Sequence, residues 1–135
     1  MEHGRVLADT SLFIEHLRAR DKTSSTLYRL TAQFQVETCA IVAAEIFYGA
    51  RKPEAAKQAW AVLHPFVIHS FTAGMAARQS ALLPVLVKRN RVPDLRDLMI
   101  AVTAIDLGIP VATLNRTHFQ SISTVPLIDL NMLSR

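Results

Sequence analysis

The chain has 135 residues, half of them hydrophobic, which is enough for one domain with a substantial apolar core. This composition excludes an intrinsically disordered protein, and no apolar run approaches the roughly 18 residues of a membrane-spanning helix. The net charge of +4 favours a polyanionic partner. Acidic residues interrupt the apolar pattern near the start, unlike in a signal or transit peptide. We therefore expect a single cytoplasmic domain over residues 1–135, with no membrane association.

Short apolar runs alternate with helical patterns along the chain. We expect strands at 5–8, 36–40, 66–69, 111–113 and 126–128. Helical spacing of apolar residues predicts a helix pair within 12–34 and helices near 53–64, 72–91 and from 94 onward. Gly108 and Pro110 are typical of the end of that last helix. The alternation predicts an α/β domain with a mostly parallel sheet flanked by helices.

Apolar side chains between residues 60 and 86 are expected to pack in the core rather than to bind a cofactor. They are Trp60, Phe66, Phe71, Leu82, Leu83 and Leu86. The single cysteine, Cys39, lies in the apolar run VETCAIV without a polar cluster beside it. We expect a small core residue there rather than a nucleophile.

Four carboxylates stand in unusual places. Asp9 follows the apolar run Val6–Ala8, Glu45 lies within AIVAAEIFYGA, and Asp94 and Asp97 open an otherwise apolar helix. A carboxylate in apolar surroundings is costly unless it is paired, protonated or bound to metal. Ligands in open α/β sheets bind at the carboxyl ends of the strands, where Asp9 is expected. A divalent cation would remove the repulsion between carboxylates gathered there.

Each carboxylate also has a structural interpretation. Asp9 and Asp94 are good helix N-caps, and Asp97 occupies a first-turn position that the helix dipole favours. Glu45 could face solvent, or could pair with the basic residues at 51 and 52. These alternatives stay open for each residue taken alone.

A third polar turn follows the expected strand at 111–113. Thr113 and Asn115 come directly after the apolar run, and His118 nearby could be a ligand, a base or a structural residue. Four basic residues fall within nine positions on the approach to Asp94 and Asp97, where they could bind phosphates or simply form a solvated helix end. They are Lys88, Arg89, Arg91 and Arg96.

Four segments in order resemble the PIN-domain ribonucleases, especially the VapC-type toxins of toxin–antitoxin pairs. They are LADTSLFIE, AAEIFYGA, RDLMIAVTAIDLGIPVATLNRTHF and IDL. The resemblance implies a three-layer α/β/α fold and an acidic site of Asp9, Glu45 and Asp97. Its further acidic position maps to Asn115, with Thr113 nearby, where many relatives carry Asp. A set of three carboxylates supports the binding of one metal ion better than the binding of two metal ions.

The same resemblance implies an endoribonuclease that uses Mg²⁺ or Mn²⁺ to cut tRNA, rRNA or mRNA. Thr10, Ser11 and Asp94 would support the metal ligands. Candidate contacts to the RNA backbone are Arg89, Arg91, Arg96 and Arg116. The implied partners are a VapB-type antitoxin, which would block the acidic site, and a second copy of the chain. For that homodimer we expect a helical face with Leu27, Leu30 and Phe34.

Two other functions remain open on sequence grounds. One is a housekeeping PIN nuclease of RNA maturation or decay. The other is a non-catalytic binding module that keeps the fold and has lost activity through Asn115.

Overall fold

The computed structural model describes residues 4–90, 92–122 and 124–133. Within these residues four strands, all parallel, form one sheet in the order β3–β2–β1–β4. The central strand β1 pairs through Leu7 with Glu37 on one side and with Val111 on the other. This position places Asp9, the residue after β1, at the middle of the carboxyl edge of the sheet. The strands are β1 (Arg5–Ala8), β2 (Gln35–Cys39), β3 (Ile68–His69) and β4 (Val111–Ala112).

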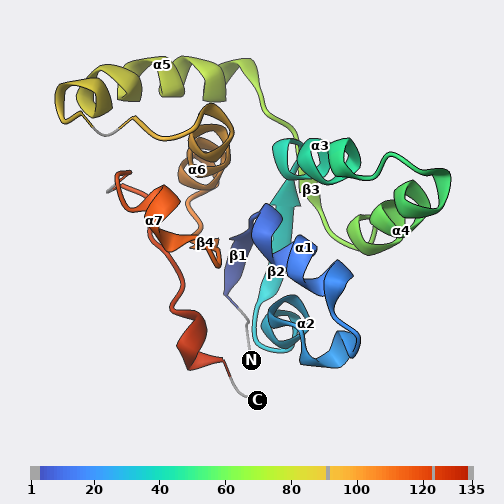
Figure 1. Ribbon diagram of the computed structural model, residues 1–135. Coiled ribbons are helices and arrows are strands. Elements are labelled where there is room, and N and C mark those ends of the chain that lie inside the picture. The colour runs from blue at the N-terminus through green and yellow to red at the C-terminus, as the bar shows by residue number, and fades with distance from the viewer. Residues whose placement is uncertain (1–3, 91, 123, 134–135) are drawn as a thin grey trace.

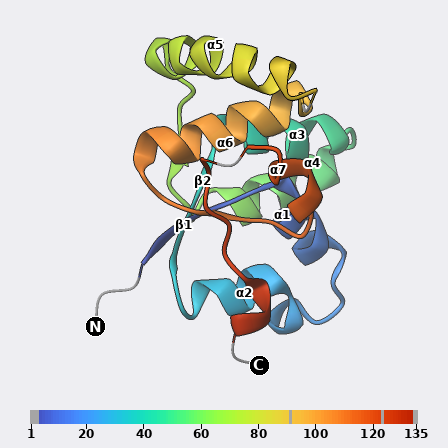
Figure 2. The ribbon, with the colours of Figure 1, turned by 90° about the vertical axis from the view of Figure 1, so that its left-hand side faces the viewer.

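Helices flank the strands on both sides, which confirms the expected α/β/α arrangement. In Figure 1, α5 and α6 lie together on one side, whereas α1, α2 and α4 lie on the other, and Figure 2 shows α5 stacked on α6. None of the described helices combines the length and apolar content that a membrane span requires. The helices are α1 (Thr10–Arg18), α2 (Thr26–Thr31), α3 (Ala40–Gly49), α4 (Pro53–Leu63), α5 (Ala73–Lys88), α6 (Leu95–Leu107) and α7 (Arg116–Phe119), with 3₁₀ turns at Lys22–Ser24 and Leu130–Met132.

The core forms around β1, whose last three residues are fully buried. Cys39 is also fully buried, and burial raises the pKa of its thiol to about 11, so it is an inert core residue as expected. Leu86 is buried, and Phe66, Phe71 and Leu82 pack against the core. The expectation was wrong for Trp60, which is 56% exposed and stacks on Phe47 and His64, and for Leu83, which is 38% exposed.

The end of α6 follows the predicted pattern. Gly108 adopts φ 70°, the left-handed conformation that a residue without Cβ takes up most easily, and its N–H caps the helix. The chain then enters β4. The strand expected at 126–128 is reduced to one parallel bridge between Val111 and Leu127. Only Val111 of β4 exchanges backbone hydrogen bonds with this segment, so the pairing does not extend into a ladder.

The predicted dimer face is wrong. Leu27 and Leu30 of α2 are 2% and 0% exposed, and Phe34 packs against the same core. These side chains cover the sheet within one copy of the chain and are not available to a second copy.

A buried carboxylate that the sequence analysis did not single out ties three strands together. Glu37 of β2 is 2% exposed and accepts hydrogen bonds from Arg5 Nε and Nη2 of β1, at 2.7 and 2.8 Å. His69 Nε2 of β3 lies 2.6 Å from Glu37 Oε1, and Gln35 Nε2 donates to Oε2 at 3.2 Å. The Arg5 hydrogen bonds dominate and lower the pKa of Glu37 from 4.5 to about 2.

We predict that Glu37→Gln lowers the free energy of unfolding at pH 7 by about 2–3 kcal/mol, because it leaves Arg5 and His69 without their carboxylate. Since folding lowers the pKa of Glu37, this stabilisation is complete above pH 4.5 and disappears as the pH falls toward 2. Urea unfolding of both proteins between these pH values measures the difference. The control is Glu54→Gln, at an exposed acid of α4. A Glu37→Gln loss no larger than that of the control would contradict the prediction.

Candidate active site at the carboxyl edge of the sheet

Hydrogen bonds from the turn after β1 and from the turn after β4 hold the side chain of Asp9. Its Oδ1 accepts hydrogen bonds from the backbone N–H of Ser11, at 3.1 Å, and from the Ser11 hydroxyl, while Oδ2 accepts one from Thr113 Oγ1 at 2.6 Å. The N-cap interpretation is therefore correct, and it coexists with a place at the sheet edge. Asp9 is 4% exposed, and this burial raises the pKa of its carboxyl despite the three hydrogen bonds; the charge of Asp97 raises the pKa further.

The turn after β4 is fixed by the same network. The backbone N–H of Leu114 donates to Ser11 Oγ at 3.0 Å, and that of Asn115 donates to Thr113 Oγ1 at 2.9 Å. Thr113 is buried, whereas Asn115 is exposed beside Ser11. Sequence positions about one hundred residues apart thus meet at Asp9, as the expected third polar turn requires.

Glu45 reaches the same edge from α3. Its Oε1 accepts a hydrogen bond from Thr10 Oγ1 at 2.9 Å, and its Oε2 lies 3.6 Å from Arg96 Nη1. In the described residues Glu45 forms no ion pair with Arg51 or Lys52, so that alternative is wrong. Arg51 instead lies over the ring of Tyr48. Thr10 therefore orients Glu45, whereas Ser11 orients Asp9.

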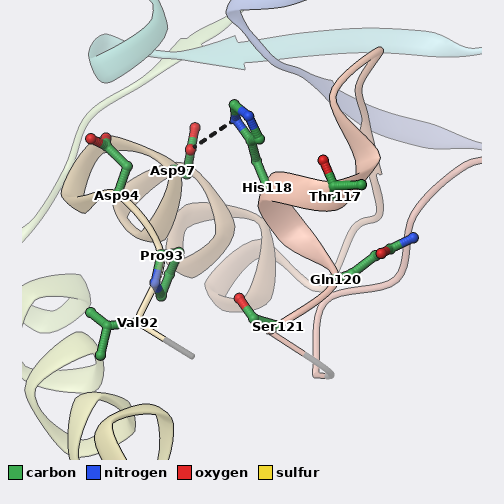
Figure 3. A pocket seen from close by; sticks show the side chains of 8 residues that line it. All are labelled: Val92, Pro93, Asp94, Asp97, Thr117, His118, Gln120 and Ser121. Carbon is green, nitrogen blue, oxygen red and sulfur yellow. Dashed lines mark ion pairs between the residues drawn. The ribbon is translucent and has the colours of Figure 1, made fainter. Parts of the chain in front are cut away.

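Asp94 and Asp97 begin α6 with different surroundings. Asp94 is the N-cap, and its Oδ1 accepts from Arg96 N at 2.9 Å and from Arg96 Nε at 3.2 Å. Asp97 is less exposed, and its Oδ2 lies 3.3 Å from His118 Nδ1 of α7 (Figure 3). Burial raises the pKa of Asp97, as does the charge of Asp94, against the opposing effects of His118 and Arg96. His118 is thus a partner of a site carboxylate.

One open pocket is lined by two of these carboxylates, and another lies beside Ser11, which donates to Asp9. One, of about 470 Å³, lies between the start of α6 and α7 and is lined by Asp94, Asp97 and His118, with Thr117, Gln120 and Ser121 also on its wall (Figure 3). The other lies beside Ser11 and Asn115. Asp94 and Asp97 are therefore reached directly from the first pocket, whereas the second pocket ends at the polar residues that hold Asp9.

The three carboxylates share one region without forming a closed cage. The charge of Asp97 raises the pKa of Asp9, and the charges of Glu45 and Asp9 both raise the pKa of Cys39 between them. Over the described residues, no three acidic, histidine or cysteine side chains meet closely enough to hold one metal ion. Mg²⁺ keeps several of its waters in proteins, so an oxygen-only set of this kind fits a cation bound through one or two carboxylates and water. We call Asp9, Glu45 and Asp97 the acidic site.

The arginines proposed for RNA binding differ in availability. Arg96 is engaged by Asp94 and Glu45, and Arg116 Nη1 donates to the backbone oxygen of Ile128 at 2.8 Å. Arg89 is exposed at the end of α5. Arg91 lies outside the described residues. Of the four predicted arginines, two thus make contacts within the chain, one lies outside the described residues, and Arg89 is exposed.

Comparison with known families supports this description of the fold. The family model of the PIN domain matches residues 6–124, which include the whole acidic site. The chain belongs to the PIN domain family. No curated protein sequence matches the chain significantly.

Several solved structures have the same fold. VapBC2 from Rickettsia felis, bound to a DNA fragment from its promoter, has a chain 22% identical with a TM-score of 0.78, covering 92% of this PIN domain and 97% of that chain. VapBC-1 from nontypeable Haemophilus influenzae has a chain that is 22% identical with a TM-score of 0.77, and the match covers 94% of this PIN domain and 98% of that chain. DNA-bound VapBC from Salmonella typhimurium has a chain that is 21% identical with a TM-score of 0.78, and the match covers 94% of this PIN domain and 98% of that chain. At these identities the likeness shows the fold alone.

We predict that Asp97→Asn stabilises the metal-free PIN domain. The folded state raises the pKa of Asp97, so at neutral pH its ionised form opposes folding, and an uncharged amide removes that penalty. The melting temperature in EDTA should therefore lie above that of the wild type. Thermal unfolding with and without EDTA measures this shift. An equal or lower melting temperature in EDTA would contradict the prediction.

Proposed function

We propose that this PIN domain is a metal-dependent endoribonuclease and the toxin of a VapBC-type pair. The observation that supports it best is the placement of two shielded carboxylates, Asp9 and Asp97, at the carboxyl edge of a parallel sheet, where the charge of one raises the pKa of the other. Such an arrangement is costly for folding and is typical of a site that acts on a ligand. The resemblance to solved VapBC structures agrees with this assignment.

Asp9, Glu45 and Asp97 would hold Mg²⁺ or Mn²⁺, directly or through water. When bound, such a cation supplies an acidified water and offsets charge on the scissile phosphate. The chain's own residues provide the orientation. Ser11 and Thr113 keep both oxygens of Asp9 in a fixed plane, and Thr10 holds Glu45 toward the same edge.

Two further groups adjust the charge of the site. His118 contacts Asp97 in the pocket between the start of α6 and α7, and its ring fixes the direction of that carboxylate. Arg96 lies between Glu45 and Asp94 and reduces the net negative charge that an approaching phosphate would meet. Asn115 adds an amide beside Ser11 that can donate to a phosphate oxygen or a water without adding charge.

A VapB-type antitoxin is the proposed protein partner, because the structural relatives are VapBC complexes. The exposed acidic edge would accept a guanidinium from that partner, which can replace a cation among carboxylates. We also propose a homodimer. Its contact must lie away from Leu27 and Leu30, and exposed apolar side chains elsewhere include Val85 and Val87 of α5 and Leu95 of α6.

A non-catalytic PIN module is the second candidate function. It is favoured by the looseness of the acidic site, in which the described carboxylates do not converge as a preformed metal cage, and by the uncharged Asn115. A pure binding module should lack metal-dependent cleavage altogether.

We predict that the purified protein cuts total bacterial RNA at discrete positions with Mg²⁺ or Mn²⁺, and that EDTA stops the cutting. Asp97→Asn should reduce the rate by at least about a hundredfold, because it removes a negative ligand without changing the shape of the side chain. The matched control is Asp106→Asn on the same helix, whose carboxylate is partly exposed and contacts Arg78 instead. RNA sequencing of the new ends and gel-based rates provide the measurement.

The controls separate the possible outcomes. Equal cutting by the wild type and Asp97→Asn would contradict the site assignment and indicate a contaminating nuclease. An absence of cutting in every condition would contradict the nuclease proposal and favour the binding module.

A further inference from the structure

We infer that Arg18, at the end of α1, binds a backbone phosphate of the single RNA strand that passes the acidic site. This inference rests on the proposed ribonuclease function. It assigns substrate contact to a residue that neither the sequence analysis nor the resemblance selected.

Two surface pockets meet at Arg18. The pocket of about 570 Å³ beside Ser11 and Asn115 is lined by Ile14 and Arg18, and so is a second pocket of about 270 Å³. The second pocket continues to Glu45 on α3 and then to the small residues of α3 and α4 that face α1. The first pocket thus reaches Ser11, which donates to Asp9, and the second reaches Glu45, so a strand that follows either pocket away from the acidic site comes to Arg18.

Arg18 is free to take an external anion. It is exposed, and among the described residues its side chain makes no ion pair or hydrogen bond. Two acidic residues line the pockets with it: Glu15, whose Oε1 accepts a hydrogen bond from the backbone N–H of Thr26 at 2.7 Å, and Glu45, which Thr10 and Arg96 engage. Arg96 and Arg116, in contrast, are engaged within the chain. Arg18 is thus an uncommitted guanidinium that lines both pockets at the acidic site.

The chemistry of the pockets suits a nucleic acid strand. The carboxylates of the acidic site repel phosphate, so a strand held there needs a fixed cation on its path besides the metal. A guanidinium can bind a phosphate through two parallel hydrogen bonds. Ile14 and Leu114 are 36% and 42% exposed in the same pocket and offer apolar surface to a ribose or a base. These features favour a single strand, which can follow a narrow curved path that a duplex cannot.

The test measures binding separately from cleavage. In an Asp97→Asn background, Arg18→Gln is compared with Arg20→Gln, which removes the same charge two residues later from an exposed side chain that lines neither pocket. The probe is a fluorescein-labelled, mixed-sequence RNA strand of about 12 nucleotides, with fluorescence anisotropy in Mg²⁺ recorded between about 50 and 300 mM salt.

Arg18→Gln should weaken binding by about tenfold and reduce the slope of log affinity against log salt by about 0.7, the value for one phosphate contact on a single strand. Arg20→Gln should change the affinity less than about twofold and leave the slope unchanged. In the active background, Arg18→Gln should raise KM and leave kcat close to that of the wild type.

Equal affinities and equal salt slopes for the two variants would overturn the inference, and would leave the pocket to another occupant such as a protein segment. If the wild type cuts RNA while Arg18→Gln behaves like Arg20→Gln, only the role of Arg18 is wrong. If the wild type neither binds nor cuts RNA, the proposed function is wrong and the inference falls with it.

Discussion

The burial of one carboxylate, that of Asp9, is the constraint on which the rest of the site depends. Asp9 follows the central strand β1, so its carboxylate can leave the core only if the sheet is disrupted. Hydrogen bonds from Ser11 and Thr113 reduce the free-energy cost of burying that carboxylate. These bonds fasten the turn after β4 to the start of α1. The nearby Asp97 makes ionisation of Asp9 still less favourable. The fold thus maintains an edge whose negative charge is incompletely compensated by its own residues, which is the electrostatic condition for cation binding.

Much of the fold could be predicted from short-range patterns. The buried strand at Val6–Ala8 was predicted from the apolar character of its residues, and the helix end at Gly108 from the backbone freedom of glycine. The structure confirms both predictions. The predictions for Trp60 and for the face of Leu27 and Leu30 were wrong for a common reason. Helical periodicity identifies which side chains share a face and cannot say whether that face meets the sheet, a neighbouring helix or solvent. Here α2 covers the core, whereas Trp60 lies at the outer side of α4.

The acidic site was predictable as a set of residues and less so as a set of contacts. The cost of carboxylates in apolar segments singled out four residues, Asp94 among them, and the family resemblance narrowed these to Asp9, Glu45 and Asp97, which the structure brings to one edge. The same reasoning applied to the run VETCAIV would have selected Glu37, whose charge is neutralised by Arg5 instead. The difference depends on which side chains from other strands lie opposite, and the sequence does not state the register. For the same reason, no local pattern distinguished the free Arg18 from the engaged Arg96 and Arg116.

The proposed function requires that the edge formed by Asp9, Glu45 and Asp97 binds a divalent cation. Its most direct test is titration of the isotope-labelled protein with Mn²⁺, followed by amide NMR, since the paramagnetic ion broadens only signals near its site. We predict that broadening begins at Ser11, Leu114 and His118 at the lowest Mn²⁺ concentrations and is reversed by excess Mg²⁺. Broadening centred elsewhere, or none at concentrations that support metal-dependent nucleases, would contradict the account.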